Sequence, residues 1–396
     1  MKKIAFGVFC LFMLSFNALS ELSVEDRLFD NEAQISALKE EISSLRNLAE
    51  QERPNAFNPS ISVIGDLLGQ YGFGMSHHDH DHDDGHGHGH DHEFHNGVFV
   101  REIEIEFRGD ISPGFDSLIA LAFEQHSMSD FGFHIEEAYA RYKGWPVEIR
   151  AGRFKAAIGR MNRLHRHNLP QISTPLAIRR FLGEEGYASQ GISLSGTQAV
   201  FENAALSLVV EGVMGSRLPT QEEGAEKIPN AVVHAWWHQQ LSLAHYFDLG
   251  ASGLVGRQGE KGSGALWLFG GDLHYSYIPT GYGQDPIFLF GLESLFLKPF
   301  RKDFSPGGFA WAQTRLLGSS FLGLRYDIAP KEEELNHFEH ALGVYLGYYF
   351  SEFLRLRGGY EHVMPSLSTF KGDHRFMLSL NFLLGSHPAE PYFANR

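Results

Sequence analysis

The sequence predicts an all-β protein: a transmembrane antiparallel β-barrel of about 16 strands, preceded by a periplasmic coiled-coil helix. From residue 60 to 384 the chain alternates apolar and polar residues in short segments, as strands between lipid and a lumen do. Connections between these segments alternate between short and long. The chain has 43 Gly, 33 Phe and 14 Tyr but is only 43% hydrophobic. This composition favours a membrane barrel over a soluble domain.

Residues 1–20 are predicted to be a signal peptide. Lys2 and Lys3 precede the apolar run 4–16, and small residues follow before Glu21. The run is too short to span a bilayer. The single cysteine, Cys10, lies inside it. The mature chain therefore lacks disulfides, and a large closed sheet is one way to stabilise an exported protein without them.

Residues 21–53 are predicted to form a coiled-coil helix. Two core positions recur at heptad spacing. They are occupied by Leu28, Ile35, Ile42 and Ala49, and by Val24, Asn31, Leu38 and Leu45. This length is marginal for a coiled coil by itself, so association would need support from the rest of the protein. The alternative is a single amphipathic helix that lies on another surface. Prolines at 54 and 59 bound the linker 54–59.

The barrel is expected to span 60–384 and to be followed by a C-terminal tail, 385–396. The alternating segments centre on 60–73, 97–109, 115–126, 131–143, 146–156, 189–197, 203–214, 232–246, 248–257, 265–278, 288–298, 307–317, 319–328, 340–350, 352–363 and 373–384. One of the short connections is expected at Phe247. An even number of strands leaves both ends of the barrel in the periplasm and the first long connection outside. Fourteen strands is the alternative count, and a soluble sandwich is the alternative fold.

The segment 77–95 reads HHDHDHDDGHGHGHDHEFH, with nine His and five Asp among its nineteen residues. Imidazole and carboxylate suit Zn²⁺, with Ni²⁺ and Cu²⁺ as competitors. The segment has almost no apolar content and cannot build a core, so we expect several weak, exchanging zinc sites. The candidate ligands are His77, His78, Asp79, His80, Asp81, His82, Asp83, Asp84, His86, His88, His90, Asp91, His92 and His95. The alternative is a polar surface loop without a metal.

Alternation along the strands also predicts which side chains line the lumen. These are Glu102, Glu104, Glu106, His234, His238, Asp272, His274, Arg355 and Arg357. Three like charges from Glu102 to Glu106 repel one another unless cations or arginines compensate, so this ladder is the best candidate for a cation path. Same-face neighbours are about 6–7 Å apart, so one ion cannot contact both His234 and His238. The alternative is that each residue pairs with an opposite charge.

The long connection 158–188 is basic and is expected to fold inward and narrow the lumen. Its candidate constriction residues are Arg160, Arg163, His165, Arg166, His167, Arg179 and Arg180. A basic constriction favours anions or repels free cations, which argues against a simple cation pore. The alternative is that these arginines pair with acidic groups of the wall.

Three stretches carry a resemblance to a known family: 55–69 (NAFNPSISVIGDLLG), 151–170 (AGRFKAAIGRMNRLHRHNLP) and 179–195 (RRFLGEEGYASQGISLS). They resemble bacterial zinc-regulated outer-membrane proteins, sometimes labelled TonB-dependent receptors, and more broadly the phosphate-selective porin group. The resemblance covers most of the mature chain. It implies a trimeric porin of about 16 strands with a periplasmic coiled coil, expressed when zinc is scarce.

The chain departs from that family in two respects. No plug domain precedes the first strand, and the chain is too short for the ~22-stranded barrel of energised transporters. This argues against TonB-dependent transport. The acidic lumen and the 77–95 segment are also unlike a phosphate-selective channel, although the basic connection fits one.

The sequence therefore favours a channel of the bacterial outer membrane for passive uptake of zinc or another divalent metal, with 77–95 capturing metal at the mouth. The alternatives are an anion-selective porin in which metal acts as a gate or sensor, and a metal-binding surface protein on a closed barrel. An enzyme is not expected, because no nucleophile motif or HExxH is present.

The expected partners follow from charge and location. Loss of the two signal-peptide lysines changes the formal net charge from −15 to −17, so nucleic acid is not an expected partner. The expected partners are outer-membrane lipid, further copies of the chain with a trimer favoured, and a periplasmic zinc-binding protein.

Overall fold

The structure is a computed structural model. It describes residues 59–74, 96–125, 130–221, 223–258, 264–279, 286–331, 337–366 and 372–385. The predicted signal peptide, coiled coil and metal segment 77–95 lie outside the described residues. So do the linker apart from Pro59 and the tail apart from Gly385. These assignments stay predictions.

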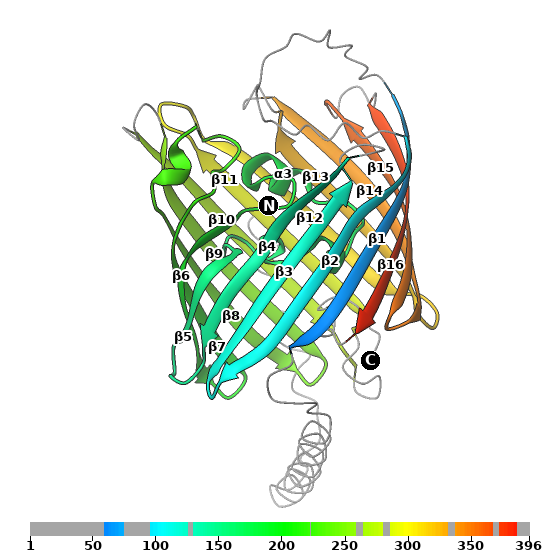
Figure 1. Cartoon of the computed structure of the whole chain (residues 1–396). Coiled ribbons are helices and arrows are strands. Elements are labelled where there is room, and N and C mark those ends of the chain that lie inside the picture. The colour runs from blue at the N-terminus through cyan, green and yellow to red at the C-terminus, as the bar shows by residue number, and fades with distance from the viewer. Residues whose placement is uncertain are drawn as a thin grey trace, which may run out of the picture. The chain divides into compact units, whose positions relative to one another are not determined.

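The described chain forms sixteen antiparallel strands that close into one barrel (Figure 1). The strands are β1 Ser60–Phe73, β2 Gly97–Ser112, β3 Phe115–Gln125, β4 Phe131–Tyr142, β5 Glu148–Lys155, β6 Ala188–Phe201, β7 Ala204–Met214, β8 Asn230–Ser242, β9 His245–Gln258, β10 Gly264–Tyr277, β11 Phe288–Lys298, β12 Ser305–Arg315, β13 Ser320–Pro330, β14 Phe338–Ser351, β15 Leu354–Met364 and β16 Asp373–Gly385. Each strand pairs with its sequence neighbours, and β1 pairs with β16. Closure leaves no sheet edge unpaired. The predicted antiparallel β-barrel of about 16 strands is confirmed.

One predicted turn was misplaced. The connection between β8 and β9 is at 243–244, whereas Phe247 lies within β9 opposite Gln239. The apolar residue Leu243 continues the alternation of β8 beyond the end of the strand pairing, which hid the turn in the sequence. The backbone N–H of Ala244 donates to Ser242 Oγ at 3.3 Å and closes the turn.

The two ends of the barrel differ. Strand β1 begins and β16 ends at one end, here called the turn end, where most connections are short. The opposite end, here called the loop end, carries the connection 156–187, the longest one lying wholly within the described residues. Strand β1 ends and β2 begins at the loop end, so the segment between them attaches there.

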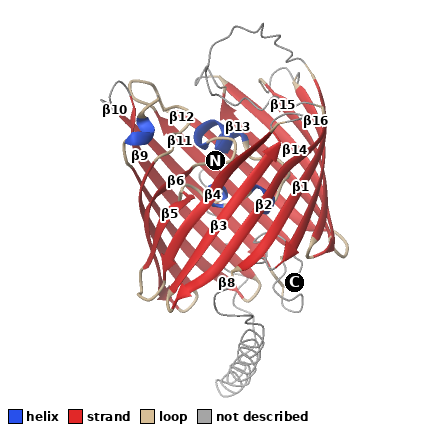
Figure 2. Ribbon diagram, in the orientation of Figure 1, coloured by secondary structure: helices blue, strands red, loops and turns tan. Residues whose placement is uncertain are grey.

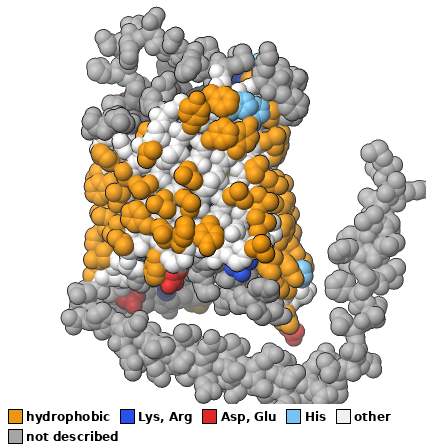
Figure 3. Space-filling view, turned by 90° about the vertical axis from the view of Figure 1, so that its right-hand side faces the viewer, with side chains coloured by type: hydrophobic (Ala, Val, Ile, Leu, Met, Phe, Trp, Pro, Cys, Tyr) orange, Lys and Arg blue, Asp and Glu red, His pale blue; other side chains and the backbone are white. Residues whose placement is uncertain are grey.

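The outer surface of the barrel is apolar. Large hydrophobic side chains are exposed along the strands, and Figure 3 shows them spread over one face of the barrel wall. They include Ile119, Phe133, Leu208, Phe269, Leu324, Leu346 and Leu378. No helix among the described residues is long and apolar enough to cross a membrane. A closed sheet pairs all its backbone groups and presents this apolar face to lipid, as outer-membrane barrels do.

The connection 156–187, here called the inward loop, turns into the lumen (Figure 2). It contains the 3-10 turns η1 Met161–Arg163 and η2 Arg166–Asn168 and the helix α3 Leu176–Leu182. Another 3-10 turn, η3 Ala225–Lys227, follows β7. Apolar side chains of the inward loop join inward residues of β7 to β13 in one core. This core includes Ile158, Met161, Phe181, Val232, Leu254, Leu268, Leu295 and Phe309.

Helix α3 approaches the wall closely at Gly307 on β12. A Cβ added there would lie 2.7 Å from the Phe181 ring and 3.3 Å from the Ala177 methyl group. A larger residue at this position would push the helix away from the strand. Glycine at 307 therefore sets how closely the inward loop packs on this side of the barrel.

Two β-bulges change which residues face the lumen. In the β1–β2 pairing the register shifts between Asp66 and Leu67, which leaves Arg101 as an extra residue beside Glu102. In the β3–β4 pairing the shift lies between Ala120 and Leu121 and leaves Glu136 as the extra residue. A bulge adds a residue to one strand without a partner on the other. Charged neighbours in the sequence thereby both reach the interior.

The lipid-facing position of Leu378 gives a first prediction. Leu378→Arg on β16 places a charge near the middle of the strand, where such a change costs about 2–4 kcal/mol in a barrel. The matched control, Leu384→Arg, keeps the same strand and face but lies near the turn end, where the cost is about 0–1 kcal/mol. Urea unfolding in lipid vesicles measures both. Equal destabilisation of the two variants would contradict the assignment of this face to lipid.

Candidate functional site

One side of the lumen is lined by carboxylates. Six of them project inward from β2, β3 and β4, and none is more than 7% exposed. They are Glu102, Glu104, Glu106, Glu124, Glu136 and Glu137. The three on β2 face inward as the sequence alternation predicted. The two on β4 are consecutive, and both face inward because of the bulge at Glu136.

Four arginines on the wall, here called the arginine clamp, bind the backbone of the inward loop. Arg355 donates to the carbonyl of His167 at 2.6 Å, and Arg357 donates to those of Leu169 and Gln171 at 3.1 Å. Arg325 donates to the carbonyl of Ser173 and Arg101 to that of Ile172, each at 2.6 Å. Hydrogen bonds from charged donors are stronger than neutral ones. Arg355 and Arg357, predicted as pore-lining, thus hold the loop.

Wall carboxylates bind the N–H groups of the same loop. Glu211 accepts from Ala157 N at 2.9 Å, and Glu293 accepts from Met161 N at 2.8 Å. Asp327 accepts from Leu176 N at 3.1 Å, at the start of α3. A buried backbone group without a partner is costly, so these contacts are what allow an irregular loop to sit inside the barrel.

Between the acidic wall and the loop lies a cluster of Glu104, Glu136, His165 and His167, here called the central cluster. Nδ1 of His165 is 2.9 Å from a Glu104 oxygen and 2.7 Å from a Glu136 oxygen. Nδ1 of His167 is 3.1 Å from the other Glu104 oxygen. Nε2 of His165 is 2.9 Å from Glu137. The four side chains of the cluster and that of Glu137 are at least nine-tenths buried.

The carboxylates of the central cluster strongly affect the charge of His165. Burial by itself lowers the pKa of His165, but the carboxylates of Glu104 and Glu136 raise it well above its usual value. The environment therefore favours positive charge at this imidazole, from a bound proton or from a cation that the ring nitrogens and carboxylates share. Imidazole and carboxylate are both ligands that Zn²⁺ prefers.

A second group lies closer to the loop end and consists of Glu124, His134 and Glu185 with Arg166. Arg166 donates to Glu124 at 2.9 Å and to Glu185 at 3.5 Å. Nε2 of His134 is 3.0 Å from Glu185. A guanidinium already lies against both carboxylates, so this group is internally paired.

The other predicted lumen residues are spread along the wall. His234 contacts Asp272, and His238 contacts Asp248, each at 2.9 Å. The two histidines therefore face different carboxylates. His274 is buried beside Trp311, with a ring separation of 5.9 Å.

The remaining basic residues of the inward loop contact the wall or the loop itself. Arg160 is 2.5 Å from Asp248, and Arg180 is 3.0 Å from Glu339. Arg163 lies over the Trp236 ring at 5.0 Å, and Arg179 is 3.9 Å from Glu184. The structure thus places the predicted constriction residues inside the barrel, with acidic or aromatic neighbours.

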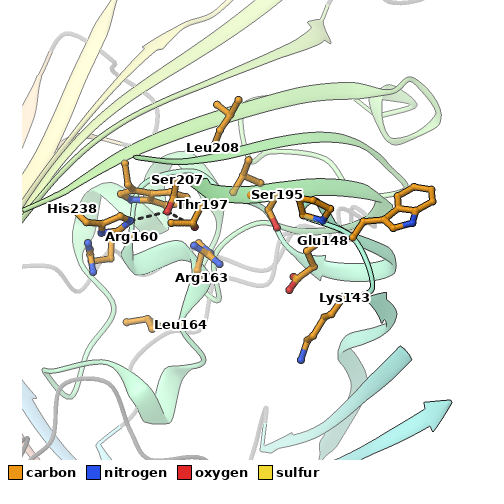
Figure 4. A pocket seen from close by; sticks show the side chains of 15 residues that line it. Lys143, Glu148, Arg160, Arg163, Leu164, Ser195, Thr197, Ser207, Leu208 and His238 are labelled. Carbon is orange, nitrogen blue, oxygen red and sulfur yellow. Dashed lines mark hydrogen bonds between the residues drawn. The ribbon is translucent and has the colours of Figure 1, made fainter. Parts of the chain in front are cut away.

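A cavity of about 710 Å³ lies between the inward loop and the turn end. Figure 4 shows Arg160, Arg163 and His238 on one side and Lys143 and Glu148 on the other. His238 contacts Ser207 at 2.9 Å, and Ser207 contacts Thr197 at 2.7 Å. Charged and hydroxyl groups therefore surround water-accessible space within the barrel.

Several residues of these clusters were not identified from the sequence: Glu124, His134, Glu136, Glu137 and Glu185. A signal for the two β4 carboxylates was present. Outward residues occur at every second position up to Ile135, but the next one in phase is Ala138. That three-residue step marks the bulge. Glu185 gave no such signal, because its position depends on the path of the inward loop.

No family model matches the chain. A stretch of 94 residues, 23% of this chain, is 31% identical to an uncharacterized protein of Aquifex aeolicus (strain VF5). That match covers only 19% of the relative's length.

Solved outer-membrane proteins share the fold. An anion-selective porin from Comamonas acidovorans matches with a TM-score of 0.55 and 12% identity, over 82% of this chain and 99% of the porin. The outer membrane channel DcaP of Acinetobacter baumannii matches with a TM-score of 0.52 and 12% identity, over 83% and 99% of the two chains. OmpT of Vibrio cholerae, in a trimer form, matches with a TM-score of 0.51 and 7% identity, over 83% and 100%. The chain has the fold of bacterial outer-membrane porins.

The arginine clamp gives a second prediction. Replacing both Arg355 and Arg357 by Met removes charge-assisted hydrogen bonds worth about 1.5–3 kcal/mol each. The inward loop should then open more often, with faster trypsin cleavage within 160–180 and higher single-channel conductance. Arg108→Met is the control, since Arg108 pairs with Glu106 on the wall. Unchanged protection of the loop in the double variant would show that other contacts hold it.

Proposed function

We propose that this barrel is a passive channel of the outer membrane for divalent metal, with zinc as the favoured cargo. The observation that carries the proposal is the row of buried carboxylates on β2 to β4 with imidazoles set against it. A metal ion can exchange its water ligands for these carboxylates and imidazoles. Several weak contacts in series then allow the ion to enter and leave.

The position of the predicted metal segment supports this proposal. Segment 77–95 joins β1 to β2 at the loop end, and the acidic ladder begins at Glu102, a few residues after His95. An extended chain of that length reaches about 20 Å. Metal gathered by the segment is thereby released close to the carboxylates of Glu102 and Glu124.

The pairing of the loop arginines with carboxylates also supports a cation path. Arg160, Arg166 and Arg180 each lie against a carboxylate. An arginine paired in this way has less remaining attraction for a passing anion. The basic connection, which suggested an anion filter, thus carries less free positive charge than its sequence implies.

An anion-selective porin is the second candidate, and one observation favours it. The cavity at the turn end is lined by Lys143, Arg160 and Arg163, and a porin with this fold is titled anion-selective. In this alternative the bound metal is a gate or a sensor and not the cargo.

We further propose that the protein is a trimer, as the family resemblance implies and as one structure of the same fold is described. The mass of the detergent-solubilised complex, measured by light scattering with the detergent subtracted, should be three times that of the chain. A mass equal to one chain would contradict the trimer and leave the channel proposal intact.

Ion selectivity and zinc entry test the channel. In planar bilayers under a salt gradient, the reversal potential should indicate preference for cations, and Glu102→Gln with Glu124→Gln should reduce that preference. In vesicles that contain a zinc-sensitive dye, deletion of 77–95 should slow zinc entry several-fold at low micromolar zinc while leaving single-channel conductance unchanged. A variant of full length in which every His and Asp of 77–95 is replaced by Ser or Gly controls for the length of the segment.

The opposite result identifies the alternative. Anion preference that is lost on Arg160→Ala and Arg163→Ala would establish the anion porin. The absence of any conductance would leave a metal-binding barrel.

A further inference from the structure

We propose that one buried divalent cation fastens the inward loop to the wall, held by Glu104 and Glu136 from β2 and β4 and by His165 and His167 from the loop. This is a fixed site, distinct in kind from the weak exchanging sites predicted at 77–95. The proposal does not depend on which ion the channel conducts.

The first observation is the convergence of three of these four side chains, with an oxygen of Glu136 2.7 Å from Nδ1 of His165. The candidate ligand atoms of Glu104, His165 and His167 all lie within 4.8 Å of one another. Zn²⁺ binds nitrogen and oxygen ligands at about 2.0–2.2 Å, so neighbouring ligand atoms around a tetrahedral ion are about 3.3 Å apart. The nitrogen–oxygen distances of 2.7–3.1 Å in the central cluster are close to this spacing.

The second observation is that a buried carboxylate is directed into the cluster without a hydrogen bond. Glu104 is 0% exposed, and neither of its oxygens accepts a hydrogen bond from the described residues. Nδ1 of His165 also donates none among them, although oxygens of Glu104 and Glu136 lie within 2.9 Å. One ring N–H cannot point at two carboxylates. A cation between these atoms would contact all of them.

The third observation is the neighbour on the other side of the His165 ring. Nε2 of His165 lies 2.9 Å from Glu137 and forms a hydrogen bond with it. A metal-binding histidine commonly donates its second ring N–H to a carboxylate, which fixes the ring's tautomer and orientation. Glu137 also accepts from the backbone N–H of Lys155 at 2.9 Å, so this supporting carboxylate is itself held in place.

The charge of the cluster favours a divalent ion. Glu102, Glu104 and Glu136 are mutually close, and their oxygens also fall within 4.8 Å of one another. The Lys155 ammonium lies 3.3 Å from Glu136, and the Arg166 guanidinium lies 3.9 Å from Glu102. Uncompensated buried charge is costly. A divalent cation supplies the missing positive charge.

The ligand set indicates which ions fit. Two imidazole nitrogens and two carboxylate oxygens are typical of Zn²⁺ and of neighbouring transition metals, whereas Ca²⁺ and Mg²⁺ take oxygen ligands alone. The nearby group of Glu124, His134 and Glu185 is a poorer site, because Arg166 already lies against both carboxylates. The inference is therefore confined to the central cluster.

The site has a structural consequence for the inward loop. The arginine clamp holds the loop's backbone from β2, β13 and β15, and Arg355 binds the carbonyl of His167 itself. A cation at the side chains of His165 and His167 would hold the same segment toward β2 and β4. The loop would then be held through its backbone and also through its side chains, and metal removal would loosen the side-chain attachment.

The test uses the full chain in detergent with every His and Asp of 77–95 replaced by Ser or Gly, so that the central cluster is measured alone. Co²⁺ titration should give one equivalent bound with the strong visible absorption of a four-coordinate site, and Zn²⁺ should displace it. His165→Gln together with His167→Gln should reduce Zn²⁺ affinity at least 100-fold. Glu137→Gln, a positioning change, should reduce it about 10–100-fold.

His340→Gln is the control, since His340 lies on β14 and contacts Tyr326 away from the cluster. Heat-modified mobility on gels verifies that each variant is folded. Zinc should also raise the unfolding temperature of the chelator-treated parent but not that of the double histidine variant.

No stoichiometric binding by the folded parent, or equal binding by the double variant, would overturn the site. Zinc flux in vesicles is a separate readout. Flux without this site would leave the channel proposal standing, and the site without flux would refute only transport.

Discussion

The structure depends on hydrogen bonds between the backbone of the inward loop and charged side chains of the barrel wall. An irregular segment inside a barrel carries N–H and C=O groups that must all find partners. Here arginines such as Arg325 and Arg355 donate to its carbonyls, while Glu211, Glu293 and Asp327 accept from its N–H groups. The wall thus takes over the role that a helix or sheet ladder has elsewhere.

This arrangement divides the lumen into two chemically different halves. On the β7 to β13 side, the loop buries apolar residues such as Phe181 against Leu268 and Leu295. On the β2 to β4 side, carboxylates face the imidazoles of His165 and His167. The clamp arginines bind the loop's carbonyls and the carboxylates of Asp66, Asp327 and Glu361, so the carboxylates of β2 to β4 are neutralised by other cationic groups. That imbalance supports both the proposed cation path and the proposed buried ion.

The comparisons confirm the outer-membrane porin fold predicted by the family resemblance, whereas zinc regulation stays a prediction. Within that fold the chemistry of this chain is its own. The carboxylate row from Glu124 through Glu104 and the imidazole of His165 lie along the lumen below the loop end. In the channel proposal a metal ion stays only briefly at each carboxylate along the path. In the proposal of a buried ion, one cation stays at the central cluster for a long time.

Alternation of side chains in the sequence by itself determined the barrel, the strand number and the inward direction of Glu102 to Glu106, because a period of two assigns each residue to lipid or lumen. It misplaced the turn at Phe247, because the apolar alternation continued past the end of the β8–β9 pairing. Only the tertiary structure decided that Glu136 and Glu137 both face inward, because a bulge breaks the period. Only it brought His165 and His167 to Glu104, because the path of the inward loop is set by contacts with strands far away in sequence.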